Sequence, residues 1–263
     1  MKEELVEKIV QEVLKKANTA GGPPQEAAPE EVKHCCSLTE FVGVGMGDTI
    51  GLVIANVDPV LHEKMGLDPK YRSIGILGGR TGAGPQIMAA DEAVKATNTE
   101  IVSIELPRDT KGGAGHGNLI IFGAEEVSDA RRAIEVALKE LERTFGDVYG
   151  NEAGHLEFQY TARASYACNK AFGAPLGKAF GLTVGAPAAI GVVLADTAVK
   201  AANVDIIGYA SPGQGTSMTN EVILFVSGDS GAVRQAIIAA REVGIQLLAS
   251  LGAKPESMTK PYI

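Results

Sequence analysis

The chain has 263 residues, a net charge of −8 and 45% hydrophobic residues, enough for one large domain or two smaller ones. No Lys/Arg-rich block and no apolar run of about 20 residues is present, which argues against nucleic-acid binding and a membrane-spanning helix. Since the chain also has no apolar leader and only three cysteines, two of them adjacent, we expect a reduced, cytoplasmic protein without a membrane partner.

Residues 1–17 are predicted to form an amphipathic helix. Its apolar side chains fall on one half of a helical wheel and its charged side chains on the other. The apolar face consists of Leu5, Val6, Ile9, Val10, Val13 and Leu14. Residues 18–36 are rich in Gly, Pro, Ala and Glu, a composition typical of a flexible linker. The apolar face therefore needs a partner, either its own domain or another protein.

The rest of the chain is predicted to form two α+β domains, residues 37–149 and 150–263, joined at 150–154. For the first domain we expect strands at 38–45, 71–79, 100–106 and 118–123, and helices at 86–98 and 128–145, with Ser128 as a helix N-cap. For the second we expect strands at 155–162, 179–186, 205–210 and 221–227, and helices at 164–172, 189–202 and 231–252.

An internal repeat connects the two predicted domains. AADEAVKATN at 89–98 and LADTAVKAAN at 194–203 match at seven of ten positions. Flanking strands and helices align as well, at an offset that changes only within a loop, where length changes are tolerated. The chain is therefore interpreted as a tandem duplication of one α+β unit.

Two glycine-rich loops are candidates for function. GGRTGAGPQ at 78–86 lies between a strand and a helix, where a phosphate could bind, but it lacks the Walker and dinucleotide spacings. A tight turn is the favoured interpretation and anion binding the alternative. The loop at 107–117 connects two strands, so it suits either a crowded symmetry axis or a flexible hairpin tip.

No catalytic or metal-binding pattern is evident. His34, His62, His116 and His155 show no ligand spacing with one another or with cysteine. Cys168 lies in a predicted short helix and is interpreted as a small packed side chain. The sequence therefore predicts no enzyme active site, metal or cofactor.

The repeated helix, the glycine-rich loops and the SGDSGAVRQAI turn at 227–237 resemble the bacterial microcompartment (BMC) shell domain in both halves. Longer segments, among them RSIGILGGRTGAGP and ERTFGDVYGNEAGH, resemble the tandem-domain trimeric shell proteins (BMC-T) of propanediol-utilisation microcompartments. The resemblance implies two circularly permuted BMC domains, each a ferredoxin-like two-layer sandwich. It also implies a homotrimeric, pseudo-hexagonal structural tile that packs edge to edge with other shell proteins.

The resemblance further implies an enclosed set of diol-metabolising enzymes and axial pore loops. From the apolar face of residues 1–17 and the linker we expect this helix to tether the enzymes, and from the glycine-rich, largely uncharged loops we expect passage of polyols such as propanediol or glycerol. The resemblance places tile-edge residues at Lys95, Asn98, Lys200 and Asn203. It places pore loops at Lys111, Gly112, Gly113, Ala114, Gly115, His116 and Gly117, and at Ser211, Pro212, Gly213, Gln214, Gly215, Thr216 and Ser217. The loops differ in length and charge, so the pore would be three-fold, and neither has a cysteine for an iron–sulfur cluster.

Two alternatives remain from the residues themselves. One is a small-molecule-binding trimer that does not tile. The other is a nucleotide-binding enzyme that uses the loop at 78–86. The sequence also leaves open whether the axial opening is open, closed or gated, and which alcohol pathway is enclosed.

Overall fold

The computed structural model describes residues 39–108 and 117–263, so the predicted N-terminal helix, the linker and most of the first pore loop lie outside the described residues. The first half contains β1 (Thr39–Gly45), β2 (Thr49–Ile54), α2 (Pro59–Lys64), β3 (Ser73–Gly79), α3 (Gly84–Ala96), β4 (Glu100–Glu105), β5 (Asn118–Ala124) and α4 (Val127–Thr144). The second contains β6 (Val148–Asn151), β7 (Gly154–Thr161), α5 (Tyr166–Phe172), β8 (Ala179–Ala186), α6 (Ala188–Ala201), β9 (Asp205–Ala210), β10 (Val222–Gly228), α7 (Ser230–Ala249) and β11 (Glu256–Ser257).

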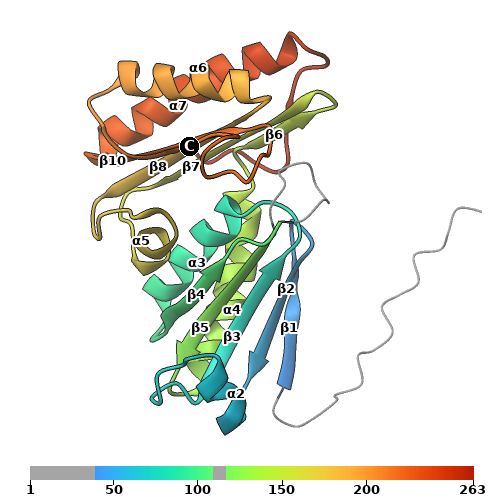
Figure 1. The fold of residues 1–263 in the computed structure, drawn as a ribbon, viewed down its shortest axis with the longest axis vertical. Helices are drawn as coiled ribbons and strands as arrows, with labels where there is room; N and C mark the ends of the chain where they lie inside the picture. Colours follow the sequence, from blue (N-terminus) through green and yellow to red (C-terminus); the bar gives the residue numbers. More distant parts are fainter. Residues whose placement is uncertain (1–38, 109–116) are drawn as a thin grey trace, which may run out of the picture. The chain divides into compact units, whose positions relative to one another are not determined.

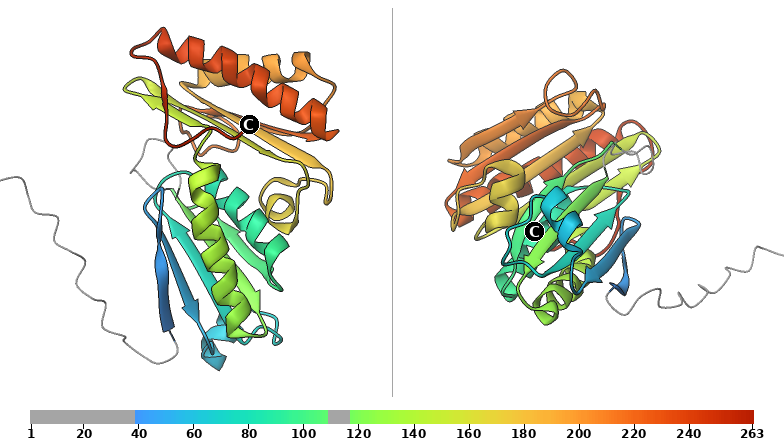
Figure 2. Two further views of the ribbon diagram at one scale, coloured as in Figure 1. Left: turned by 180° about the vertical axis from the view of Figure 1, so that it is seen from behind. Right: turned by 60° about the horizontal axis from the view of Figure 1, so that its bottom comes forward.

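The two halves share one topology. The first sheet has the strand order β1-β2-β3-β5-β4, and the second has β11-β6-β7-β8-β10-β9, with β11 as an added edge strand. Helices α3 and α4 form the helical layer of the first half, and α6 and α7 form that of the second half (Figures 1 and 2). The predicted pair of two-layer α+β domains is confirmed.

Matched glycines let the long helices approach the sheets closely. A Cβ atom on Gly75 in β3 would lie 2.9 Å from Ile134 of α4, and one on Gly181 in β8 would lie 2.8 Å from Val233 of α7. A real Cβ cannot occupy such a position without displacing the helix. The high glycine content therefore supports close packing of helix on sheet in both halves.

The prediction of Ser128 as an N-cap was wrong. Helix α4 begins at Val127, and its N-cap is Glu126, whose side chain makes no capping hydrogen bond. The helix starts only a few residues after β5 ends, which places Ser128 inside its first turn. The predicted joint at residues 150–154 lies within the β6–β7 hairpin of the second sheet.

Strand β2 and helix α2 were not predicted, although α2 carries a recognisable start signal. Asp58 caps it, since its side chain accepts hydrogen bonds from the backbone N–H groups of Val60 and Leu61, and Pro59 follows at the first helical position. The helix has only six residues, too few for a periodic pattern.

The C-terminal residues are anchored on Asp147, at the junction of the halves. Its fully buried carboxylate accepts hydrogen bonds from Arg241 Nη1 at 2.6 Å, Tyr262 N at 2.8 Å and Ile263 N at 3.0 Å. These contacts hold Tyr262 beside β7, where its hydroxyl donates to Gln159 Oε1 at 3.2 Å.

Within the described residues, no helix is long and apolar enough to cross a membrane.

Candidate functional site at the seam between the halves

Helix α3 is covered by the second half of the chain. We define the seam as the contact of α3 and α4 with β7, α5 and the C-terminal residues. Ile87 and Met88 of α3 are almost completely buried, and Met88 packs in a cluster with Cys168 of α5 and Phe180 of β8. Ala167 of α5 in turn joins the core of the first half. The seam is therefore part of the hydrophobic core, and Cys168 is a packed side chain, as predicted.

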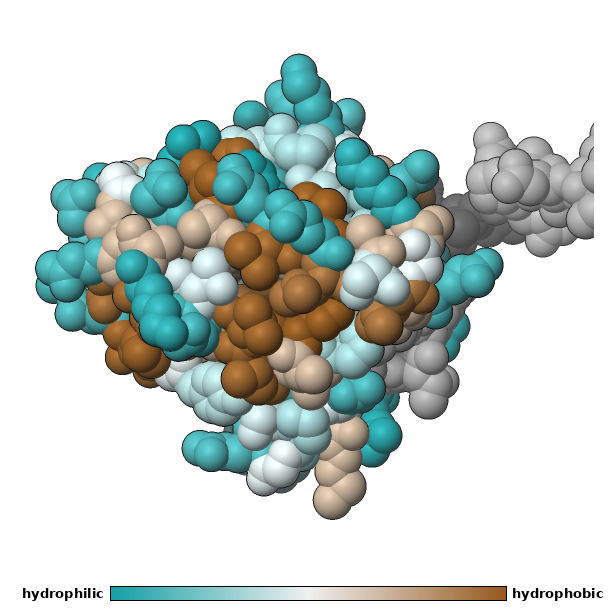
Figure 3. Space-filling view, turned by 90° about the horizontal axis from the view of Figure 1, so that it is seen from above, coloured by the Kyte–Doolittle hydropathy of each residue, from teal (hydrophilic) through white to brown (hydrophobic). Residues whose placement is uncertain are grey.

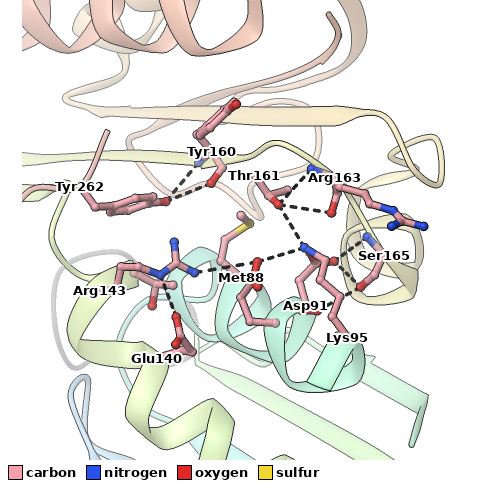
Figure 4. A network of polar contacts seen from close by, with 12 residues as sticks. Met88, Asp91, Lys95, Glu140, Arg143, Tyr160, Thr161, Arg163, Ser165 and Tyr262 are labelled. Atoms are coloured by element: carbon pink, nitrogen blue, oxygen red, sulfur yellow. Dashed lines mark hydrogen bonds and ion pairs between the residues drawn. The ribbon is translucent and has the colours of Figure 1, made fainter. Parts of the chain in front are cut away.

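A buried carboxylate crosses the seam (Figure 4). Asp91 of α3 is fully buried, and its Oδ1 accepts hydrogen bonds from Ser165 N at 2.8 Å and Ser165 Oγ at 2.6 Å. Cys168 N lies 3.4 Å from the same oxygen. The side chain of Ser165, the N-cap of α5, makes no capping hydrogen bond, so Asp91 caps this helix from the other half of the chain.

Lys95 neutralises Asp91 and lies inside this network. Its Nζ is 2.7 Å from Asp91 Oδ2, 3.0 Å from Glu92 Oε1 and 3.1 Å from Thr161 Oγ1 of the second half. Burial lowers the pKa of Lys95, but Asp91 and Glu92 outweigh it, so the net pKa is raised and the ammonium stays charged.

The matched lysine of the repeat has a different environment. The side chain of Lys200 is 73% exposed, against 27% for Lys95, and its Nζ lies 2.7 Å from Oδ2 of the exposed Asp196 on the same helix. Asn98 and Asn203, the other predicted edge residues, are both exposed. Of the two predicted lysines, Lys200 is thus the more accessible.

The outer face of α6 remains uncovered in the single chain. Val192 and Val193 match Ile87 and Met88 in the repeat, yet they are 50% and 42% exposed. Figure 3 looks onto the side of the molecule where α6 and α7 lie and shows an apolar area at its centre. The same helix position is therefore buried in one half and open in the other.

A cavity of about 630 Å³ lies where the turn before α3 approaches the β6–β7 hairpin. It is lined by the 81–85 turn, the β6–β7 hairpin and residues 219–221, and we call it the Glu157 cavity. Glu157 is 6% exposed, and its Oε1 has no hydrogen-bond partner. Burial and the charge of Glu221 raise the pKa of Glu157 to about 8. Near neutral pH, Glu157 is thus mostly an uncharged acid that can donate a hydrogen bond.

Protein side chains fill the glycine-rich turn at 78–86. A Cβ atom on Gly84 would lie 1.8 Å from Glu157 Oε1, and Gly82 has a φ of +72°. The amide of Gln86 donates to Thr49 Oγ1 at 3.0 Å and to Thr81 O at 2.9 Å. The segment is thus a tight turn into α3, as favoured from the sequence.

The predicted pore loops are described in part. Gly117 is buried and donates to Pro107 O at 2.8 Å, which closes the base of the first loop, whereas Lys111–His116 lie outside the described residues. In the second loop, Ser211 N donates to Gln214 O at 2.6 Å, Thr216 is buried, and Ser217 has a φ of +53°. The position of these loops on a molecular axis stays a prediction.

Sequence reasoning missed Glu157 and the capping role of Asp91. A charged residue within the predicted strand 155–162 was a signal for the first, since this strand is otherwise rich in apolar and aromatic residues. No signal indicated that Asp91 would be buried and Asp196 exposed. Among the residues that the structure describes, no cluster of three or more His, Cys, Asp or Glu side chains could hold a metal ion.

The fold and its repeat define the class of the protein. The BMC domain model matches residues 73–152 and 179–254, and the chain belongs to the family of BMC-domain shell proteins. The chain is 64% identical to the bacterial microcompartment shell protein PduB of Salmonella typhimurium, over 99% of this chain and 98% of the relative. It is 55% identical to PduB of Limosilactobacillus reuteri, over 86% and 96% of the two chains.

Solved structures agree with this assignment. A crystal structure of a trimeric shell protein PduB has a TM-score of 0.82 and 56% identity, over 85% of this chain and 99% of that one. EtuB from Clostridium kluyveri also has a TM-score of 0.82, with 59% identity, over 85% and 98%. The PduB relatives are bacterial microcompartment shell proteins, so the family is structural rather than enzymatic.

The raised pKa of Glu157 predicts a pH-dependent cost to folding. The folded protein keeps this proton to about pH 8, whereas the unfolded chain loses it near pH 4.5, so the contribution of Glu157 to stability falls as the pH rises between these values. In wild type, Glu157 should lower the free energy of unfolding by about 1.4 kcal/mol per pH unit over this range, and Glu157→Gln should remove this dependence. Chemical denaturation from pH 5 to 9 measures it. Glu152→Gln, on the same hairpin but exposed, is the control, and parallel profiles for Glu157→Gln and wild type would contradict the assignment.

Proposed function

We propose that three copies of this chain form a pseudo-hexagonal tile in the shell of a bacterial microcompartment. The observation that carries the proposal is the unequal burial of the repeated helix, with Met88 buried and Val193 exposed. Within one chain, α3 packs against β7 and α5 of the second half. In a ring of chains, α6 would pack in the same way against the next chain.

The first half offers a surface suited to this contact. Strand β2 and helix α2 occupy the positions in the first half that β7 and α5 occupy in the second. They expose Ile50, Val60 and Leu61 at 40%, 66% and 46%. Two apolar surfaces that are each open in the single chain would then bury one another. A closed three-fold ring satisfies every such contact and supplies six similar units per tile.

The tile edges are assigned to Lys95, Asn98, Lys200 and Asn203 from the family resemblance. The exposed ammonium of Lys200 supports this role most directly, since the ammonium of Lys95 already contacts two carboxylates and Thr161. Other shell proteins would be the partners along these edges. The assembled shell would lie in the bacterial cytoplasm around diol-metabolising enzymes.

The Glu157 cavity supports passage or binding of a small polyol. Its lining includes the neutral acid of Glu157 and the side chains of Thr81 and Asn220, which can exchange hydrogen bonds with hydroxyl groups. Its volume of about 630 Å³ exceeds what propanediol or glycerol requires. The predicted axial loops are the other candidate route.

The N-terminal helix is proposed to tether the enclosed enzymes to the shell. Its six apolar residues would be worth several kcal/mol on docking, at roughly 1.5 kcal/mol or more for each large side chain. The linker of residues 18–36 can extend about 60 Å at ~3.3 Å per residue, which allows the helix to reach a partner beyond the tile.

Different variants should separate trimer formation from tiling. Val193→Asp should prevent trimer formation, because the carboxylate would be buried in the proposed contact, and light scattering measures the mass. Lys200→Ala should leave the trimer intact and abolish sheets in electron microscopy. Val60→Asp is the matched test on the opposing surface, and Val127→Asp, an exposed valine outside the contact, is the control. If Val193→Asp still forms trimers, the proposed ring contact is wrong. If Lys95→Ala/Lys200→Ala still forms sheets, the trimers tile through other residues.

Crystals soaked in propanediol or glycerol should show an ordered polyol in the Glu157 cavity. Glu157→Leu should abolish this density, because the hydrogen-bonding group is lost while the site becomes apolar. Crystals of the Glu242→Gln variant, which changes an exposed glutamate of α7 outside the cavity lining, should bind as the wild type does. An empty cavity, with polyol only at the axial loops, would assign passage to the loops instead.

Deletion of residues 1–33 should leave trimers and tiles unchanged but yield shells without enzymes. Ile9→Asp/Val13→Asp should have the same effect, since charges on the apolar face prevent docking. Co-purification of the enzymes with intact shells measures loading, and Lys8→Asp on the polar face is the control. Normal loading of both variants would refute the tethering role.

A further inference from the structure

The Glu157 cavity has an acidic lining. Glu152, Glu157, Glu221 and His155 face it, and no lysine or arginine is among the described residues that line it. Glu152 is exposed at the tip of the β6–β7 hairpin, whereas the side chain of Glu221 is only 4% exposed. The interior of the cavity therefore carries carboxyl groups without a basic lining residue to offset their charge.

The strand register brings the two buried glutamates close together. Glu157 and His155 are alternate residues of β7, so their side chains lie on one face of the sheet. His155 pairs with Ala186 of β8, and its Nε2 lies 3.4 Å from Glu221 Oε2. Thr219 Oγ1 donates to the other carboxylate oxygen of Glu221 at 2.8 Å. These contacts hold the charge of Glu221 at the wall on which Glu157 lies.

Several groups together set the protonation of Glu157. Burial and the charge of Glu221 raise its pKa to about 8, and Gln159 on the same strand lowers the pKa by hydrogen bonding but is outweighed. From α3, Gly84 meets Glu157 Oε1 without a side chain, since a Cβ there would lie 1.8 Å away. His155 is the other titratable side chain of this wall. Removal of the charge of Glu221 should therefore let Glu157 ionise at a lower pH.

We propose that Glu221 is a positioning residue of the cavity: its charge keeps Glu157 in the form that donates a hydrogen bond, which makes the cavity selective for neutral hydroxyl compounds over carboxylate anions. This inference rests on the polyol site proposed above. A ligand hydroxyl can accept from Glu157 and carries no charge. A carboxylate could accept as well, but it would lie near the negative charge of Glu221 in a largely buried site, where repulsion is poorly screened.

Lactate and 1,2-propanediol test the selectivity, because they differ only in a carboxylate in place of a CH₂OH group. Titration calorimetry of the full-length protein at pH 6 should show saturable propanediol binding and lactate binding that is weaker by about tenfold or more. Glu221→Gln should raise the affinity for lactate relative to propanediol by about tenfold, a gain that a damaged fold cannot produce. Glu242→Gln, on α7 outside the lining, is the control and should keep the wild-type ratio.

The protonation of Glu157 distinguishes a positioning role from direct repulsion of the ligand. The infrared C=O band of protonated Glu157 is the band that Glu157→Gln removes. It should persist to about pH 8 in wild type and disappear at a lower pH in Glu221→Gln.

Three results would overturn the inference. Lactate that binds wild type as tightly as propanediol refutes the selectivity, and this comparison needs no variant. Propanediol binding with an unchanged affinity ratio or an unchanged infrared titration in Glu221→Gln refutes the role of Glu221 and leaves the polyol site standing. Absence of propanediol binding to wild type refutes the polyol site and this inference together.

Discussion

The buried carboxylate of Asp91 is the contact on which the arrangement of the two halves depends. A charge at 0% exposure is costly unless every oxygen is paired, and here the partners come from both halves: Lys95 from its own helix, and Ser165 and Cys168 from α5. A displacement of α5 along α3 would leave Asp91 without these donors and α5 without its cap. Apolar packing of Met88 and Cys168 stabilises the seam, but the directional hydrogen bonds fix its register.

The same dependence explains why one chain carries the same helix twice. The first copy uses its outer face inside the chain, and the second presents the matching face outward, with Val192 and Val193 in place of Ile87 and Met88. In the proposed ring, the duplication places one such contact within the chain and the matching contact between chains. It also frees the two copies to diverge, as the different environments of Lys95 and Lys200 and the unequal loops illustrate.

The Glu157 cavity contains a neutral acid whose Oε1 has no hydrogen-bond partner. A shell made only of equivalent units would repeat one such environment around its axis. Ile50 of β2 occupies the strand position that Glu157 occupies in β7. The contact between the two halves therefore contains a carboxyl group where the proposed contact between chains would contain an apolar side chain.

The sequence by itself determined the duplication, the α+β class, most strands and helices, and the family. These follow from local periodicity, turn residues and the repeat, all of which are written along the chain. Its errors were local too: Ser128 lies within the first turn of α4, and α2 is too short for a periodic signal. Only the tertiary structure decided which copy of each repeated residue is buried. Asp91 and Asp196 have nearly identical neighbours in sequence, and their burial differs because β7 and α5 cover one of them and not the other. Burial and pKa depend on which segments meet in space, and for that reason the roles of Asp91 and Glu157 could not be read from the chain alone.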